Sequence, residues 1–88
     1  MVEQEKYIVY AIYNKVCEKI YIGQTEDLQT RLRLHNDKTF KQSYTSRFSG
    51  EWEIIYTEEL ESRQKAVIRE KQLKSYRGRD FLKQYIPQ

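Results

Sequence analysis

The chain has 88 residues, which we expect to form a single domain over residues 1–88 with a core of marginal size. The lone cysteine, Cys17, excludes an internal disulfide and a cysteine-based zinc site. No apolar run approaches the roughly 18 residues of a membrane span, and the start of the chain does not resemble a signal peptide. We therefore expect a soluble, cytoplasmic protein.

Charge is distributed unevenly along the chain, although the net charge is only +3. Residues 31–50 and 62–88 carry net charges of +4 and +6, whereas residues 51–61 between them carry −5. Basic segments attract polyanions, nucleic acid foremost, but a solvated helix face gives the same pattern. The eight tyrosines offer stacking rings and hydroxyls, which are both useful beside a nucleic-acid strand.

The first predicted elements are two strands. Residues 7–13 form an unbroken aromatic and β-branched run, which predicts a strand with both faces largely covered. A polar connection over residues 14–18 leads to a second strand over residues 19–23. The short connection favours an antiparallel hairpin, and Gly23 ends the second strand where the backbone needs conformational freedom.

A helix and a third strand follow the hairpin. Thr25 is the expected N-cap of a helix that extends to about Asn36, with acidic residues in its first turn. Residues 37–50 lack periodicity and predict a loop. Hydrophobic residues then alternate with neighbours over residues 51–56, which predicts a strand; they are Trp52, Ile54 and Tyr56.

The last third of the chain is predicted to be helical. Ser62 is the expected N-cap of a second helix that continues to about Tyr76 and ends at Gly78. Residues 81–86 place apolar side chains at helical spacing and predict a short docked helix. The apolar stripe of the second helix is formed by Ala66, Val67, Leu73 and Tyr76. The expected class is α+β, with the order ββαβα followed by a short C-terminal helix.

Glu70 is the most anomalous residue, because helical spacing places it inside that apolar stripe. Burying an unpaired carboxylate costs several kcal/mol, so Glu70 needs a partner, either an arginine or a metal ion. A buried ion pair and a metal ligand are about equally well supported by this residue alone. A hard cation such as Mg²⁺ accepts one or two carboxylates and completes its shell with water and phosphate oxygens.

Other residues with useful chemistry lie nearby in the expected elements. Arg31 and His35 share one edge of the first helix, where they offer a phosphate-binding guanidinium and a group that moves protons near neutral pH. Tyr10 and Tyr21 lie on the two strands. A tyrosine becomes a usable general base if a cation lowers its pKa. Each of these residues is also compatible with an ordinary surface or core position.

These residues, in this order, resemble the GIY-YIG nuclease superfamily. Ile8-Val9-Tyr10 stands at the first motif in degenerate form, and Tyr21-Ile22-Gly23 matches the second letter for letter. The segment from Tyr21 to His35 resembles small stand-alone members and the nuclease domain of the repair enzyme excinuclease. By this resemblance Arg31 stands at the catalytic arginine, His35 where members carry His or Tyr, and Glu70 at the metal-binding glutamate.

The resemblance implies a small three-stranded antiparallel sheet flanked by helices, and cleavage of a nucleic-acid phosphodiester with one divalent metal ion. We therefore expect a Mg²⁺- or Mn²⁺-dependent endonuclease on DNA, including structured or damaged DNA in repair or processing. Its catalytic residues would be Tyr10, Tyr21, Arg31, His35 and Glu70, with Glu70 as the metal ligand. Expected nucleic-acid contacts are Gln24, which replaces a frequent lysine, and Lys38, Lys41, Arg47, Arg69 and Lys74.

Two other classes of function remain open at this point. One is a non-catalytic nucleic-acid-binding module that retains the nuclease fold, and the other is a protein-interaction domain. The chain lacks the separate DNA-binding domain of larger members, so we expect a protein partner to supply targeting. Metal dependence distinguishes the nuclease from the binding module. Salt dependence distinguishes both from a protein-interaction domain, because phosphate contacts release counterions.

Overall fold

A computed structural model of the chain describes residues 6–36 and 49–87. Its elements are the strands β1 (Tyr7–Asn14) and β2 (Lys19–Thr25), the helix α1 (Leu28–Asn36), the strand β3 (Trp52–Leu60), the helices α2 (Arg63–Lys74) and α3 (Tyr76–Leu82), and the short 3-10 helix η2 (Lys83–Tyr85). This order confirms the predicted class. Most of the predicted loop over residues 37–50, including Lys38, Lys41 and Arg47, lies outside the described residues.

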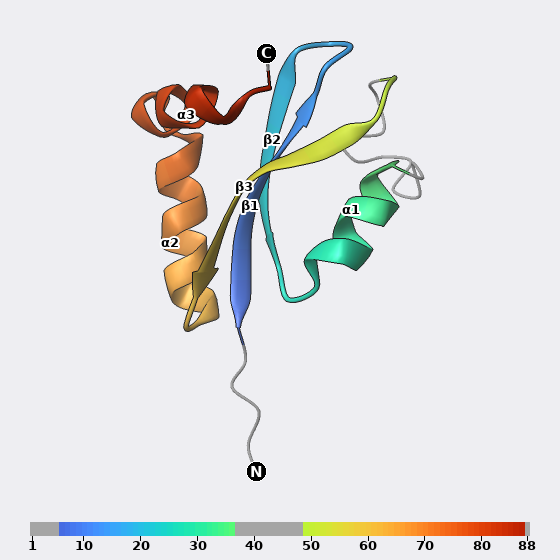
Figure 1. Cartoon of the computed structure of the whole chain (residues 1–88). Coiled ribbons are helices and arrows are strands. Elements are labelled where there is room, and N and C mark those ends of the chain that lie inside the picture. Colours follow the sequence, from blue (N-terminus) through green and yellow to red (C-terminus); the bar gives the residue numbers. More distant parts are fainter. Residues whose placement is uncertain (1–5, 37–48, 88) are drawn as a thin grey trace.

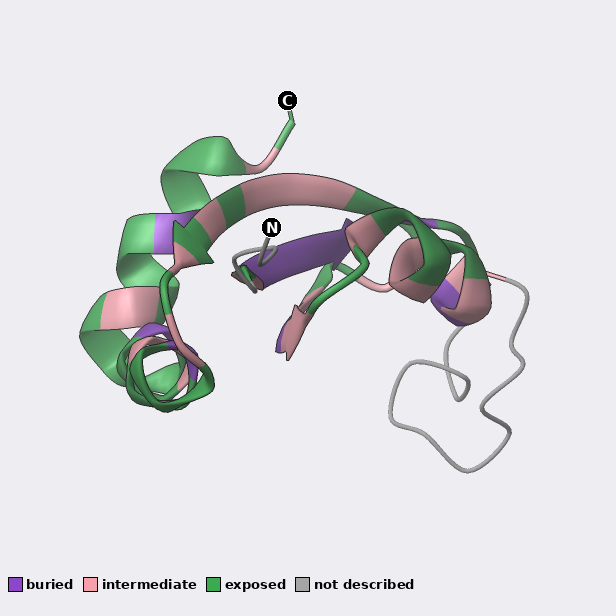
Figure 2. Cartoon of the chain, turned by 90° about the horizontal axis from the view of Figure 1, so that it is seen from below, coloured by how far each residue is buried: buried purple, intermediate pink, exposed green. Residues whose placement is uncertain are grey.

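The three strands form one antiparallel sheet in the order β2-β1-β3 (Figure 1). The central strand β1 is buried over its last six residues, as its aromatic and β-branched run predicted. Figure 2 shows this buried strand between α2 on one side and α1 on the other. Each face of the sheet is therefore covered by a different helix, which leaves β2 as an edge strand between them.

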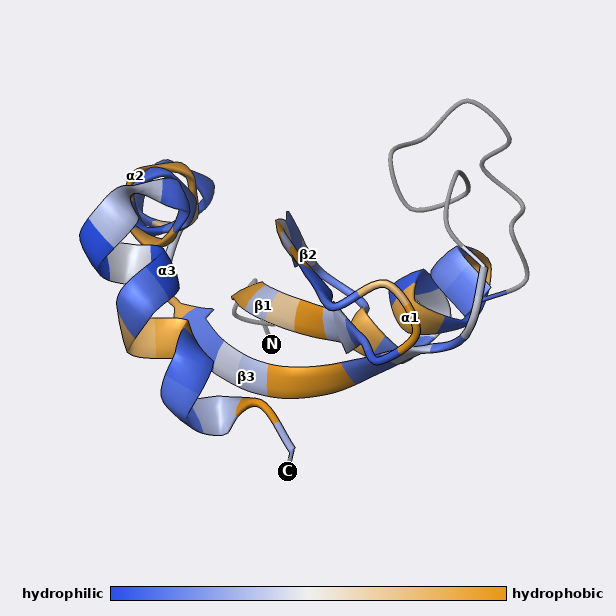
Figure 3. Cartoon of the chain, turned by 90° about the horizontal axis from the view of Figure 1, so that it is seen from above, coloured by the Kyte–Doolittle hydropathy of each residue, from blue (hydrophilic) through white to orange (hydrophobic). Residues whose placement is uncertain are grey.

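Two hydrophobic clusters occupy the two faces of the sheet. The cluster beneath α2 and α3 contains Val9, Ala11, Ile22, Ala66, Leu73 and Leu82. The cluster beneath α1 contains Tyr10, Ile12 and Trp52, with Leu28 and Leu32 packed against it. Figure 3 shows the hydrophobic stretches on β1 and β3, whereas the outer surfaces of the helices are mainly hydrophilic.

A β-bulge alters the predicted alternation of β3. Ala11 pairs with Tyr56 and Ile12 pairs with Ile54, so Ile55 is an extra residue on β3. The bulge reverses the facing of the residues that follow. Ile54 consequently packs under α1, whereas Tyr56 packs under α2 and α3.

The first helix begins later than its sequence predicted, because β2 continues to pair with β1 as far as Thr25. Thr25 is therefore a strand residue, and its Oγ1 accepts a hydrogen bond from the Asp27 N–H. Asp27 provides the N-cap, since its Oδ1 accepts from the Thr30 N–H at 3.1 Å. At the other end, the Asn36 side chain donates to the Trp52 carbonyl and accepts from the Trp52 N–H, which attaches α1 to β3.

The second helix is shorter than predicted. Ser62 is its N-cap, as expected, but Ser75 ends α2 and caps α3, so Tyr76 belongs to α3 and is 85% exposed. Gly78 lies inside α3 rather than after α2, and a Cβ there would clash with the backbone of Gln72 and Leu73. The buried edge of α2 consists of Ala66 and Leu73 alone, and the predicted stripe residue Val67 is 45% exposed.

The N-cap of α1 gives a pH-dependent prediction. Hydrogen bonds from the Thr30 hydroxyl and N–H hold the pKa of Asp27 below its ordinary value of 3.8. A depressed folded-state pKa means that the carboxylate stabilises the fold above its unfolded-state pKa, and that this stabilisation is lost as the pH falls through the folded-state pKa. We expect Asp27→Asn to flatten the acid limb of the melting temperature against pH. An acid limb identical to that of the parent would refute a contribution from the charge.

The helices of the described ranges give no sign of a membrane span, because none is both long and apolar enough to cross a bilayer. This agrees with the charges that interrupt every apolar run of the sequence.

Candidate active site at the β2 edge of the sheet

Two tyrosines from neighbouring strands face α1. Tyr10 pairs across the sheet with Gly23, and Tyr21 lies two residues before Gly23 on β2. Residues two apart on a strand point to the same face, so both rings join the cluster beneath α1. Their ring centroids lie 6.3 Å apart, with the planes tilted by 43°.

Gly23 provides the space that the two rings occupy. A Cβ on Gly23 would lie 2.7 Å from the Tyr10 Oη and 3.1 Å from a ring carbon of Tyr21. The glycine does not end β2, as the sequence suggested, because β2 continues for two residues beyond it. Its function is to let the Tyr10 ring cross β2 in close contact with the backbone.

His35 connects α1 to this pair of tyrosines. It is a core residue, only 3% exposed, and its Nε2 lies 3.0 Å from the Tyr10 Oη. If the neutral imidazole carries its proton on Nδ1, the Tyr10 hydroxyl donates to Nε2. The His35 ring also lies 5.0 Å from the Tyr21 ring, centroid to centroid. Three proton-carrying side chains from β1, β2 and α1 thus form one cluster.

Two opposite charges act on this cluster. Burial raises the pKa of Tyr10 well above its ordinary value of 10.0, and it also raises the pKa of Tyr21. The Glu70 carboxylate raises both pKa values further, whereas the Arg31 guanidinium lowers both. Arg31 on α1 and Glu70 on α2 therefore lie close enough to influence the same hydroxyls, although their helices cover opposite faces of the sheet.

Glu70 has a partner, but it is neither of the partners that its sequence position suggested. Its carboxylate, 20% exposed, lies 3.8 Å from the Lys74 Nζ. An ion pair of this length between i and i+4 positions is weak. The carboxylate is therefore positioned beside the tyrosines without a strong ion pair that would neutralise it.

The residues present fit a hydrated hard cation better than a protein-enclosed metal. Within residues 6–36 and 49–87, no three His, Cys, Asp or Glu side chains group closely enough to hold a metal ion. Mg²⁺ does not require such a cage, since one or two carboxylates with waters and substrate phosphates suffice. Glu70 is the carboxylate that could serve in this way, because it is partly exposed beside the phenols.

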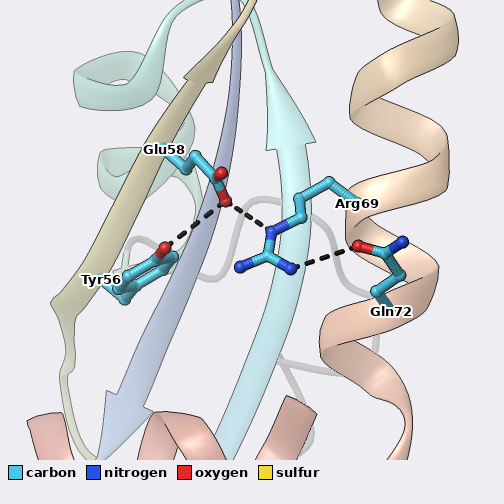
Figure 4. Close-up of polar contacts among 4 residues, drawn as sticks. All are labelled: Tyr56, Glu58, Arg69 and Gln72. Atoms are coloured by element: carbon cyan, nitrogen blue, oxygen red, sulfur yellow. Dashed lines mark hydrogen bonds and ion pairs between the residues drawn. The ribbon is translucent and has the colours of Figure 1, made fainter.

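The predicted nucleic-acid contacts have different surroundings. Arg69 faces β3, where its Nε donates to the Glu58 Oε2 at 2.6 Å and its guanidinium also contacts Gln72 (Figure 4). The Tyr56 hydroxyl donates to the same Glu58 oxygen. A phosphate contact by Arg69 would compete with this network. Gln24 and Lys74 lie nearer the tyrosine cluster, through Arg31 and Glu70 respectively.

A shallow groove of about 340 Å³ adjoins the cluster. It is lined by Tyr7, Gln24, Thr25, Glu26, Arg31 and Arg63, together with the capping residue Asp27. Sequence analysis did not select Tyr7 or Arg63. The pairing of Ile8 with Thr25 and the position of Arg63 directly after a helix cap both place residues at this end of the sheet, but neither signal singles out these side chains.

The close packing at Gly23 gives a prediction about activity. We expect Gly23→Ala to move the Tyr10 hydroxyl, because the new methyl group would occupy its present position. A displacement of about 1 Å in an active site costs roughly 10²-fold in rate. Nuclease assays and thermal melts of both proteins test this expectation. A variant that retains the parent's rate would show that the position of Tyr10 is unimportant for catalysis.

Comparisons with known proteins agree with this arrangement. A sequence model of the GIY-YIG catalytic domain matches residues 6–84. Among solved structures, the chain is similar to the UPF0213 protein BH0048 from Bacillus halodurans, with 25% sequence identity and a TM-score of 0.52. That similarity covers 88% of this chain and 81% of the other. No curated protein matches the chain.

Proposed function

Because the chain belongs to the GIY-YIG catalytic domain family, which is a family of nucleases, we propose that it is a metal-dependent endonuclease that hydrolyses phosphodiester bonds in DNA. The observation that best supports this proposal is the clustering of Tyr10, Tyr21 and His35 within the fields of Arg31 and Glu70. These five residues come from β1, β2, α1 and α2, and their packing alone does not require so many polar groups.

Glu70 is the proposed ligand of Mg²⁺ or Mn²⁺. Such a cation would supply Lewis-acid polarisation of a phosphoryl oxygen and positive charge beside the leaving oxygen. The weak contact with Lys74, at 3.8 Å, leaves the carboxylate available for this function. Lys74 itself is then free to contact a neighbouring phosphate.

Arg31 is proposed to bind the scissile phosphate. Negative charge increases on the phosphoryl oxygens as the attacking water approaches, and a fixed guanidinium stabilises that charge. Arg31 is held by α1, whose two ends are fixed by the Asp27 cap and by the Asn36 contacts with Trp52. The guanidinium is therefore positioned before the substrate binds.

The two tyrosines have different proposed functions. The Tyr10 hydroxyl is engaged with His35 and the residue is only 2% exposed, so it positions the imidazole and does not meet water. Tyr21 is only partly buried, and its hydroxyl is proposed to orient and deprotonate the attacking water. The positive charge of Arg31 favours the phenolate that this proton transfer produces.

The remaining contacts are proposed to fix the strand without reading its sequence. Gln24 lies in the groove with Arg31, and Lys74 lies beside Glu70. Lys38, Lys41 and Arg47 remain proposed contacts from the segment outside the described residues. A repair or processing role, cytoplasmic location, a targeting partner and a single domain over residues 1–88 likewise belong to the proposal.

A non-catalytic nucleic-acid-binding module is the second candidate. It is favoured by the contact of Glu70 with Lys74, because an internal ammonium could take the place of a metal ion. Purified protein incubated with duplex, nicked, branched and single-stranded DNA in Mg²⁺, Mn²⁺ or EDTA distinguishes the two. Cleavage that stops in EDTA supports the nuclease, whereas binding without cleavage in any metal supports the module.

A further inference from the structure

The groove beside Arg31 joins elements from both sides of the sheet. Its arginines come from different helices, since Arg31 lies on α1 and Arg63 is the first residue of α2. Tyr7 at the start of β1 and Gln24 near the end of β2 lie between them. Figure 1 shows these ends of β1, β2 and α2 at the same end of the molecule, opposite α3. The groove thus extends from the proposed catalytic arginine toward α2.

Arg63 differs from the other arginine of α2. Arg69 is committed to Glu58 through a 2.6 Å ion pair. The exposed side chain of Arg63 has no hydrogen bond or ion pair with another residue of the described ranges. A guanidinium without an internal partner, at the wall of a groove, is suited to bind an external phosphate in bidentate fashion.

Two carboxylates limit where an anion can lie in this groove. Asp27 is committed to the α1 cap, and its lowered pKa keeps it ionised. Glu26 is exposed and would repel a phosphate. A backbone in the groove would therefore lie toward Arg31, Gln24 and Arg63 and away from Glu26. This asymmetry predicts opposite effects of neutralising Arg63 and Glu26.

We propose that the groove binds the sugar-phosphate backbone next to the scissile phosphate, and that Arg63 is a positioning residue for the adjoining phosphate. The inference rests on the proposed function, because Arg31 marks the scissile phosphate. The ring of Tyr7 provides a face for the neighbouring sugar or base. The substrate must then extend at least one phosphate beyond the cut, so a polynucleotide is cleaved and a dinucleotide is not.

Steady-state kinetics test the function of Arg63. We expect Arg63→Gln to raise KM about five- to tenfold with kcat nearly unchanged, because the contact is made equally in the ground and transition states. Glu26→Gln should lower KM. Arg77→Gln is the matched control, since Arg77 is an exposed arginine on α3 at the other end of the molecule. A KM of Arg63→Gln equal to that of Arg77→Gln would overturn the proposal.

A second measurement identifies the phosphate that Arg63 contacts. DNA with one neutral methylphosphonate next to the cut should bind the parent as weakly as unmodified DNA binds Arg63→Gln, and should weaken that variant no further. Equal further weakening of both proteins would overturn the assignment. These affinities are measured in EDTA and do not require cleavage. A parent that shows this coupling but cleaves nothing would refute the nuclease and retain the groove.

Discussion

Glu70→Gln is expected to reduce metal-dependent DNA cleavage by about 10³-fold or more while the protein stays folded. The substitution removes the charge that would attract the cation and preserves the shape of the side chain. The fold should tolerate it, because the carboxylate is 20% exposed and makes only a 3.8 Å contact with Lys74. Cleavage rates across a Mg²⁺ titration, together with thermal melts, measure both effects.

A suitable control is Glu53→Gln, which removes an exposed carboxylate from β3. It should cleave DNA at the parent's rate. If Glu70→Gln melts far below the parent, the carboxylate is a structural residue and the ion-pair interpretation of the sequence is correct. If Glu70→Gln retains the parent's metal dependence, the cation binds elsewhere.

Arg31→Ala has the second largest expected effect. A preorganised donor that contacts developing charge is typically worth 10²- to 10³-fold in kcat, and we expect a loss of about this size. DNA affinity should fall only a few-fold, because the contact with Arg31 strengthens mainly in the transition state. Single-turnover cleavage and equilibrium binding in EDTA separate the two quantities.

Arg33→Ala is the matched control for this substitution, since Arg33 is an exposed arginine on the same helix. It should lower affinity slightly and leave the cleavage rate unchanged. Equal rates for Arg31→Ala and the parent would remove Arg31 from catalysis. An equal loss of affinity and rate would make it an ordinary binding residue.

Local sequence signals were sufficient to predict the element order. The unbroken apolar run of β1 predicted a strand covered on both faces, and Ser62 correctly marked the start of α2. The errors arose where tertiary contacts determine an element's end. Pairing with β1 extended β2 through Thr25 and moved the helix cap to Asp27, and Ser75 redirected the chain before Tyr76.

The candidate site could be predicted only in part, because its residues are distant in sequence. Glu70 attracted attention as a carboxylate among apolar neighbours, yet its actual partner, Lys74, is a weak one. The importance of Gly23 depends on the ring of Tyr10 across the sheet, which no local pattern reveals. Arg63 resembles any other exposed helix arginine until the folded chain places it in a groove with Arg31.

The most direct test of the central claim, that one metal-dependent site lies at the β2 edge, is paramagnetic broadening by Mn²⁺ in NMR spectra of the protein bound to uncleavable DNA. We expect broadening of signals from Tyr21, His35 and Glu70, no broadening of Arg77 on α3, and loss of the effect in Glu70→Gln. Broadening centred on the acidic segment 58–61, or its persistence unchanged in Glu70→Gln, would contradict the proposed site.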